Sequence, residues 1–318
     1  MIQFFTVVTT NYLPFAVSLL DSVKKYHPEF EVCICVADYI SPDVIAKNSL
    51  MGRHPMLQLH EIEAEEFDFI TTTYNSMQLA IASKILFARH FLDQDNVDQV
   101  IYADSDMLFF NRLPEHIITE HDIIFTPHFS TAPPLWMKRQ ELEVLNAGLI
   151  NVGFYKLRKS AETDKFITWY RERSVKDCIK DFVAGYYFEQ LWLNFVPLYF
   201  KDTFLDKGFG LNMAYWNLHE RTLSEADGRF MVNDTIPLIF FHYSGWDYND
   251  PLNISRWALI TSAMRPDIIP VLQAYHETLQ RNEYESYINL PNFYTANNQS
   301  KKKSFFKKLK HKLFKKKK

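Results

Sequence analysis

The chain has 318 residues, of which 47% are apolar and 16% aromatic, so it can bury a sizeable core and is not disordered as a whole. Its formal charge of −3 hides an asymmetry, because the last 18 residues hold 11 Lys and no Asp or Glu, and the body before them has 24 basic against 38 acidic residues, a net charge of −14. An acidic body argues against nucleic acid as a partner.

Three cysteines are too few for a disulfide framework, and this favours a reducing, cytoplasmic compartment. The sequence has no run of about 20 apolar residues of the kind that crosses a bilayer. The apolar start at 1–8 lacks the basic segment and the cleavage site of a signal peptide, so we expect none.

Short apolar runs alternate with helical patterns over the first hundred residues, which predicts βαβ units around a mostly parallel sheet. In this region we expect strands at 3–8, 31–36, 57–61 and 99–103, and helices at 15–26 and 77–91. Farther along we expect strands at 149–155 and 238–242, and helices at 161–173 and 189–195. The chain has only eight glycines and no glycine-rich phosphate loop, so a divalent cation is the expected means of holding phosphate.

Asp104 and Asp106 follow the apolar strand predicted at 99–103, separated by the small Ser105. Open α/β sheets bind ligands beyond the carboxyl ends of their strands, and paired carboxylates offer the hard oxygen ligands that Mn²⁺ or Mg²⁺ prefers. A second D-x-D, at 93–95, lies in a polar helix-to-strand turn where Asp is an ordinary turn residue. The first pair is therefore the predicted metal site, and a solvated strand-end turn is the alternative.

His242 ends another apolar run and is followed three residues later by Gly245. A lone histidine after a strand is more often structural than a ligand. Here it supplies a nitrogen at a strand end, and the glycine permits a ligand to approach the backbone closely.

Four motifs follow one another along the chain: ADSDM at 103–107, LNAGLIN at 145–151, FEQLWLN at 188–194 and HYSG at 242–245. In this order they resemble the motifs of glycosyltransferase family 8, and the bacterial lipooligosaccharide galactosyltransferases of that family in particular. The resemblance implies a GT-A fold, α/β with a Rossmann-like, mostly parallel sheet flanked by helices. It also implies a retaining transfer of a hexose from a nucleotide diphosphate sugar, expected to be UDP-linked, to a cell-surface glycan or lipid-linked acceptor, as in lipopolysaccharide biosynthesis.

By this resemblance Asp104, Asp106 and His242 are the ligands of a Mn²⁺ (or Mg²⁺) ion that binds the donor diphosphate. The remaining positions of the donor site that the resemblance implies are Thr9, Asn11, Tyr12, Lys84, Ser105, Asn146, Ala147 and Gly245. Tyr12 would stack on the base, or else pack under a loop. Lys84 would contact phosphate or sugar, or else extend along the surface. Asn146 and Ala147 would line the donor sugar, although an Asn close before a Gly is also typical of a turn.

Gln190 matches the family residue beside the anomeric carbon, and Glu189 is its acidic neighbour. A glutamine is a poor nucleophile, which leaves electrostatic stabilisation or front-face attack as its route, with Glu189 as a second candidate for a covalent or acid–base role. Thr9 stands where the family commonly has an Asp for uracil. The lysine expected after the HYSG motif is also absent, so Lys84 or another residue must compensate.

The predicted organisation is a catalytic domain at 1–290, with its nucleotide-binding half at about 1–110, a linker at 291–300 and a basic tail at 301–318. The tail gathers aromatic and leucine residues on one face among lysines, which is typical of a helix that binds an anionic membrane surface. This places the protein on the inner face of the cytoplasmic membrane; a disordered solubilising tail or a nucleic-acid contact are the alternatives. Rival functions are a nucleotidyltransferase that makes sugar nucleotides and a non-catalytic, membrane-associated sugar-nucleotide-binding protein.

Overall fold

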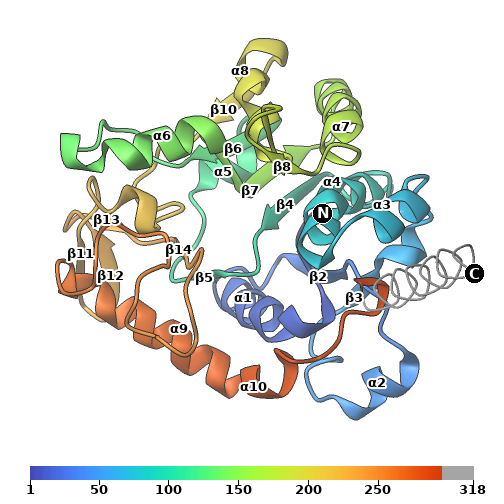
Figure 1. The fold of residues 1–318 in the computed structure, drawn as a ribbon, viewed down its shortest axis with the longest axis horizontal. Helices are drawn as coiled ribbons and strands as arrows, with labels where there is room; N and C mark the ends of the chain where they lie inside the picture. The colour runs from blue at the N-terminus through green and yellow to red at the C-terminus, as the bar shows by residue number, and fades with distance from the viewer. Residues whose placement is uncertain (296–318) are drawn as a thin grey trace, which may run out of the picture.

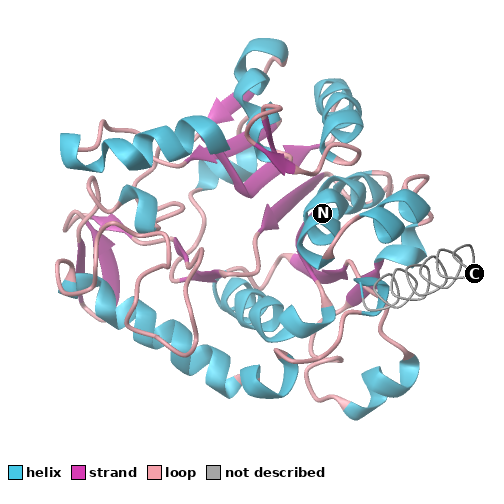
Figure 2. Cartoon of the chain, viewed as in Figure 1, coloured by secondary structure: helices cyan, strands magenta, loops and turns pink. Residues whose placement is uncertain are grey.

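A seven-stranded sheet lies at the centre of the computed structural model, which describes residues 1–295 (Figures 1 and 2). The strand order is β10-β6-β7-β4-β1-β2-β3. In that order the bounds are Thr203–Leu205, Ile123–Pro127, Ile150–Arg158, Gln99–Ala103, Ile2–Val8, Glu31–Val36 and Met56–Gln58. Only β7 runs antiparallel to its neighbours, β4 and β6; the other pairs are parallel. The predicted mostly parallel sheet is confirmed.

Helices cover both faces of this sheet because its strands are apolar on both sides. Side chains alternate along β1, so Phe4 packs into the cluster beneath α1 (Leu13–Tyr26) while Phe5 packs into the cluster beneath α4 (Ser76–Leu92). The other helices are α2 (Pro42–Lys47), α3 (Phe67–Thr73), α5 (Glu115–Thr119), α6 (Lys138–Ala147), α7 (Ala161–Ser174), α8 (Val196–Tyr199), α9 (Ile269–Arg281) and α10 (Tyr284–Tyr287).

A second layer carries the C-terminal part of the site. In it β14 (Phe240–His242) pairs antiparallel with β5 (Met107–Phe109), and Figure 1 shows this pair between α1 and the β11–β13 sheet. The remaining strands are β8 (Lys180–Asp181), β9 (Tyr186–Tyr187), β11 (Leu223–Ala226), β12 (Arg229–Val232) and β13 (Ile236–Pro237). A third apolar cluster, which includes Phe241, Tyr243 and Tyr275, joins β14 to α9.

Most predicted elements are confirmed within a residue or two. The strand expected at 149–155 continues to Arg158, and two other elements need correction. The strand expected at 57–61 ends at Gln58, and a 3₁₀ helix, Leu59–Ile62, follows, because the Glu61 carboxylate accepts the Gln58 N–H and caps the turn. The helix expected at 189–195 is a 3₁₀ helix, Gln190–Phe195, with Glu189 at its N-cap.

The C-terminal end of the described chain packs against the domain. Asn292 donates to Ser76 Oγ at 3.0 Å, Phe293 lies beside Tyr39, and Tyr294 lies beside Phe67. Packing therefore continues through 295 into the segment predicted as a linker, while the rest of that linker and the basic tail lie outside the described residues. Among residues 1–295 no helix has the length and apolarity needed to cross a membrane.

Candidate active site

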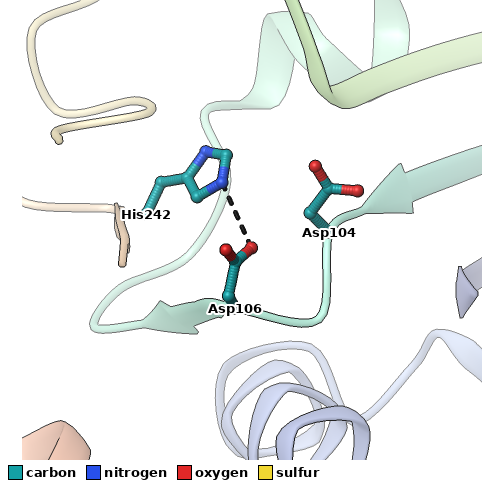
Figure 3. Close-up of side chains that lie close together, drawn as sticks. All are labelled: Asp104, Asp106 and His242. Carbon is teal, nitrogen blue, oxygen red and sulfur yellow. Dashed lines mark ion pairs between the residues drawn. The ribbon is translucent and has the colours of Figure 1, made fainter. Parts of the chain in front are cut away.

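Asp104, Asp106 and His242 converge at one edge of the central sheet. One ligand atom from each lies within 4.8 Å of the others, and His242 Nε2 is 3.1 Å from Asp106 Oδ1. Figure 3 shows Asp104 at the end of β4, Asp106 at the start of β5 and the imidazole of His242 directed toward the carboxylates. The structure thus brings together three residues from distant parts of the sequence.

Backbone pairing explains this convergence. The register of β14 against β5 places His242 opposite Met107, and the Tyr243 N–H donates to the Asp106 carbonyl at 2.8 Å. The Asp104 N–H donates to the Gly153 carbonyl of β7 at 2.7 Å. Hydrogen bonds on both sides of the D-x-D turn therefore hold it against two neighbouring strands.

His242 is oriented by a buried asparagine that the sequence analysis did not identify. Its Nδ1 lies 3.1 Å from Asn212 Oδ1, while the amide nitrogen of Asn212 donates to Thr126 Oγ1 at 3.1 Å and to Asn151 Oδ1 at 3.2 Å. The amide oxygen is thus left to accept the Nδ1–H, which gives Nε2 the lone pair. Two carboxylates and an imidazole nitrogen with a fixed tautomer are a donor set that fits a divalent cation.

Lys84 ties the D-x-D turn to Glu189. Its ammonium lies 2.9 Å from Asp104 and 3.3 Å from Glu189, and only 7% of the lysine is exposed. Burial lowers the pKa of Lys84, but the two carboxylates outweigh it and hold that pKa above its ordinary value. Lys84 is therefore a buried, charged bridge and not the surface lysine that was the alternative.

The two carboxyl groups on this bridge are shifted in opposite directions. Burial raises the pKa of Asp104, but Lys84 and His242, helped by a hydrogen bond from Tyr102, hold it below its usual value. The pKa of Glu189 is raised, because the effect of burial outweighs the opposite effect of the Lys84 charge. Asp104 is thus held ionised, as a metal ligand must be, whereas Glu189 is the better proton carrier of the two.

Gln190 is buried and fixed at both ends of its amide. Its Oε1 accepts from the Val152 N–H at 3.1 Å and its Nε2 donates to the Ala147 carbonyl at 3.0 Å. The side chain therefore links β7 to the end of α6, next to Glu189. Asn146, one residue before Ala147, is exposed on the last turn of α6.

The candidates that follow β1 lie in the 3₁₀ helix Thr10–Tyr12 and just before it. Thr9 Oγ1 donates to Asn11 Oδ1 at 2.8 Å, and the Asn11 amide donates to the Ile288 carbonyl at 3.5 Å. Tyr12 is 42% exposed, with one side stacked on Phe15 at a centroid distance of 4.8 Å. An exposed ring on a rigid support is suited to stacking on a base.

Two small residues complete the predicted set. Ser105 is half-buried between the two aspartates. Gly245 has a φ of +72°, and a Cβ there would lie 2.5 Å from Trp257 Cδ1 and 2.6 Å from Ser255 Oγ, so this turn requires glycine.

The second D-x-D segment, at 93–95, is not part of the candidate metal site. Asp93 is the C-cap of α4 and forms an ion pair with Arg89, and Asp95 is exposed. Neither belongs to the cluster formed with His242.

The comparisons with known proteins agree with this geometry. The sequence profile of Glycosyl transferase family 8 matches residues 4–249. Two uncharacterized proteins of Bacillus subtilis (strain 168) are similar: YfnF, 24% identical over 86% of this chain and 90% of its own length, and YfnD, 23% identical over 77% and 78%.

Solved glycosyltransferase structures share the fold. LgtC, a galactosyltransferase in complex with donor and acceptor sugar analogs, has a TM-score of 0.51 at 14% identity, covering 91% of this chain and 97% of that chain. GlyE of Streptococcus pneumoniae TIGR4 has a TM-score of 0.50 at 12% identity, covering 91% of this chain and 64% of its own. The chain belongs to glycosyl transferase family 8 and is a GT-A glycosyltransferase, with a sugar-nucleotide donor and an acceptor.

Proposed function

We propose that the protein is a metal-dependent, retaining glycosyltransferase that moves a hexose from a UDP-linked donor to a cell-surface glycan or lipid-linked acceptor. The observation that carries the proposal is the convergence of Asp104, Asp106 and His242 within 4.8 Å. These three residues would hold Mn²⁺ or Mg²⁺, which when bound neutralises charge on the donor diphosphate and on the departing nucleotide.

Side chains of the protein would bind the base, keep a metal ligand ionised and stabilise charge on the sugar. Tyr12 offers its exposed face to the base, and Lys84 keeps Asp104 ionised at the centre of the site. Gln190, whose amide is held by Val152 and Ala147, would present a fixed dipole to the positive charge that develops on the sugar ring.

Glu189 is less suited to attack the sugar directly. It is 3% exposed and its carboxylate is engaged by Lys84. This arrangement favours a front-face route in which Glu189 holds the lysine bridge and Gln190 stabilises charge. One similar solved structure is an active-site mutant of LgtC in which a glutamine is replaced by glutamate, and by analogy this supports the role proposed for Gln190.

The decisive test is Asp106→Ala, assayed for sugar transfer from a set of nucleotide sugars with excess Mn²⁺. We expect loss of transfer by at least about 100-fold, since a hard ligand is removed from the metal. Asp95→Ala, which removes an aspartate of the other D-x-D, is the matched control and should keep full activity. Wild-type rates in Asp106→Ala would refute the metal role.

We further propose that the basic tail, 301–318, attaches the enzyme to an anionic membrane surface on the cytoplasmic side. Eleven lysines support this, because each one near such a surface contributes about 1 kcal/mol. The full chain should sediment together with vesicles that contain phosphatidylglycerol, whereas a chain ending at 295 should stay in the supernatant. Equal sedimentation of the full chain and the shortened chain would refute this proposal.

A further inference from the structure

The charges around the D-x-D turn do not fully compensate those of a bound diphosphate. Asp104, Asp106 and Glu189 are the acidic groups of the site, and Lys84 is already shared between two of them. The two positive charges of a divalent ion would be divided between the carboxylates and the diphosphate, so part of the charge of a bound diphosphate would remain uncompensated. A further positive group near the metal site is needed to balance it.

Arg256 lies in the segment that packs against the turn after His242. Its N–H donates to the Gly245 carbonyl at 3.0 Å. The preceding Ser255 and the following Trp257 both lie so close to Gly245 that a Cβ there would meet them at 2.5–2.7 Å. The backbone of Arg256 is therefore fixed beside the loop that follows His242. Both segments are far from the D-x-D turn along the sequence.

The guanidinium of Arg256 lies within electrostatic reach of the Tyr12 hydroxyl. Burial raises the pKa of the Tyr12 hydroxyl, the negative charge of Asp106 raises it further, and the positive charge of Arg256 lowers it. One tyrosine thus lies within the electrostatic reach of both groups. Tyr12 is also the proposed base-stacking residue, so Arg256 lies near it as well as beside the loop that follows the proposed metal ligand His242.

The side-chain N–H groups of Arg256 are also available to a ligand. Its side chain is exposed and rests on the ring of Trp257 at 5.2 Å, and within residues 1–295 it makes no ion pair or side-chain hydrogen bond. Lys84, by contrast, is buried and has two carboxylate partners. An exposed, unpaired guanidinium can offer two parallel N–H groups to a phosphate.

We propose that Arg256 binds the diphosphate of the donor as a positioning residue for the nucleotide. The inference rests on the proposed function, because it requires that a nucleoside diphosphate binds at this site. It assigns to Arg256 the phosphate contact for which Lys84 was the expected candidate.

The test is calorimetric titration of the full chain with UDP, GDP, ADP and CDP in the presence of Mn²⁺, followed by the variants with whichever binds. Arg256→Ala should weaken binding of that nucleoside diphosphate about tenfold or more, the effect of losing a charged hydrogen bond, and Arg256→Lys should restore part of it. Affinity for the matching nucleoside, measured by competition, should change less than about twofold. Arg229→Ala, an exposed arginine of β12, is the matched control.

The possible results separate the two hypotheses. Unchanged diphosphate affinity in Arg256→Ala, with the wild type binding well, would overturn the Arg256 assignment and leave the proposed function standing. Equal weakening for nucleoside and diphosphate would also overturn it, since Arg256 would then shape the base pocket. A wild-type chain that binds none of the four diphosphates would overturn the proposed function and this inference together.

Discussion

The Nζ atom of Lys84 lies 2.9 Å from Oδ1 of Asp104, so a proposed metal ligand is also one half of a buried ion pair. The other carboxylate on the lysine, Glu189, is almost completely buried. Because the lysine is in α4 and the aspartate directly follows β4, this bridge ties the helix to the end of the strand. The site is therefore stabilised by the same charges that its proposed chemistry requires.

Replacing Lys84 by Met should destabilise the protein by about 3 kcal/mol, because two buried carboxylates lose their cation. The loss should be largest at neutral pH and shrink toward pH 5, as the unpaired carboxyl groups take up protons and become neutral. Urea unfolding at pH 7.5 and pH 5 measures both effects. Lys138→Met, at an exposed position of α6, is the control, and equal stability of the two variants would contradict the prediction.

Asn212 should control the metal affinity of His242 without touching the metal. Asn212→Leu removes the acceptor for Nδ1–H and frees the ring to turn, so Mn²⁺ binding should weaken about 10- to 100-fold. Asn212→Asp keeps an acceptor and should retain most of the affinity. Titration followed by the Mn²⁺ EPR signal compares the variants; identical affinities in Asn212→Leu and the wild type would show that the hydrogen bond is irrelevant.

The metal-site candidates could be predicted from the sequence because each of them follows an apolar run. Asp104 and His242 stand at the ends of β4 and β14, and strand ends are where open α/β sheets gather polar groups. Asn212 and Arg256 lie outside regular elements, so no periodicity marks them. Their contacts arise only when the second layer folds back onto the D-x-D turn, and this is tertiary information that a local pattern does not contain.

The conformation of 57–62 shows a similar limit. Its apolar residues predicted a strand, yet a capping interaction between Gln58 and Glu61 turns the chain into a 3₁₀ helix after three residues. The role expected of Lys84 shows the limit for side chains, because a lysine on a helix gives no sign of whether it faces solvent or two carboxylates. The Lys84 side chain is buried, and its burial follows from how α4 packs on the sheet.

Gly153 should be intolerant of even one added methyl group. A Cβ there would lie 2.7 Å from His242 Cε1, 2.8 Å from Asn151 Oδ1 and 2.9 Å from Met107 Cε. Gly153→Ala should therefore displace the imidazole, weaken Mn²⁺ binding about tenfold or more, and destabilise the fold by about 1–3 kcal/mol.

Gly52→Ala is the matched control for this change, because nothing lies within 4 Å of a Cβ at that position. Metal titration and thermal unfolding of the two alanine variants give the comparison. Wild-type metal affinity in Gly153→Ala would show that the imidazole has more room than the structure gives it.

His128 should make the protein less stable in acid. Burial lowers the pKa of His128 to about 4 from its ordinary value of 6.5, and its hydrogen bonds suit the neutral ring, since Nδ1 faces the Leu149 carbonyl and Nε2 faces the Asn151 amide. Above pH 6.5 neither the folded nor the unfolded chain binds the proton, so His128 has no effect there. Between pH 6.5 and 4 the unfolded chain takes up the proton and the folded chain does not, which lowers the free energy of unfolding by about 3 kcal/mol in all.

The measurement is the free energy of unfolding by urea at intervals from pH 7.5 to pH 4, for the wild type and His128→Asn. The variant is expected to lose stability at neutral pH, since packing against Trp216 is disturbed, but to lose about 3 kcal/mol less than the wild type as the pH falls. His60→Gln, at an exposed position, controls for the general effect of removing a histidine. Parallel pH curves for wild type and His128→Asn would mean that the buried ring is protonated as readily in the folded chain as in the unfolded one.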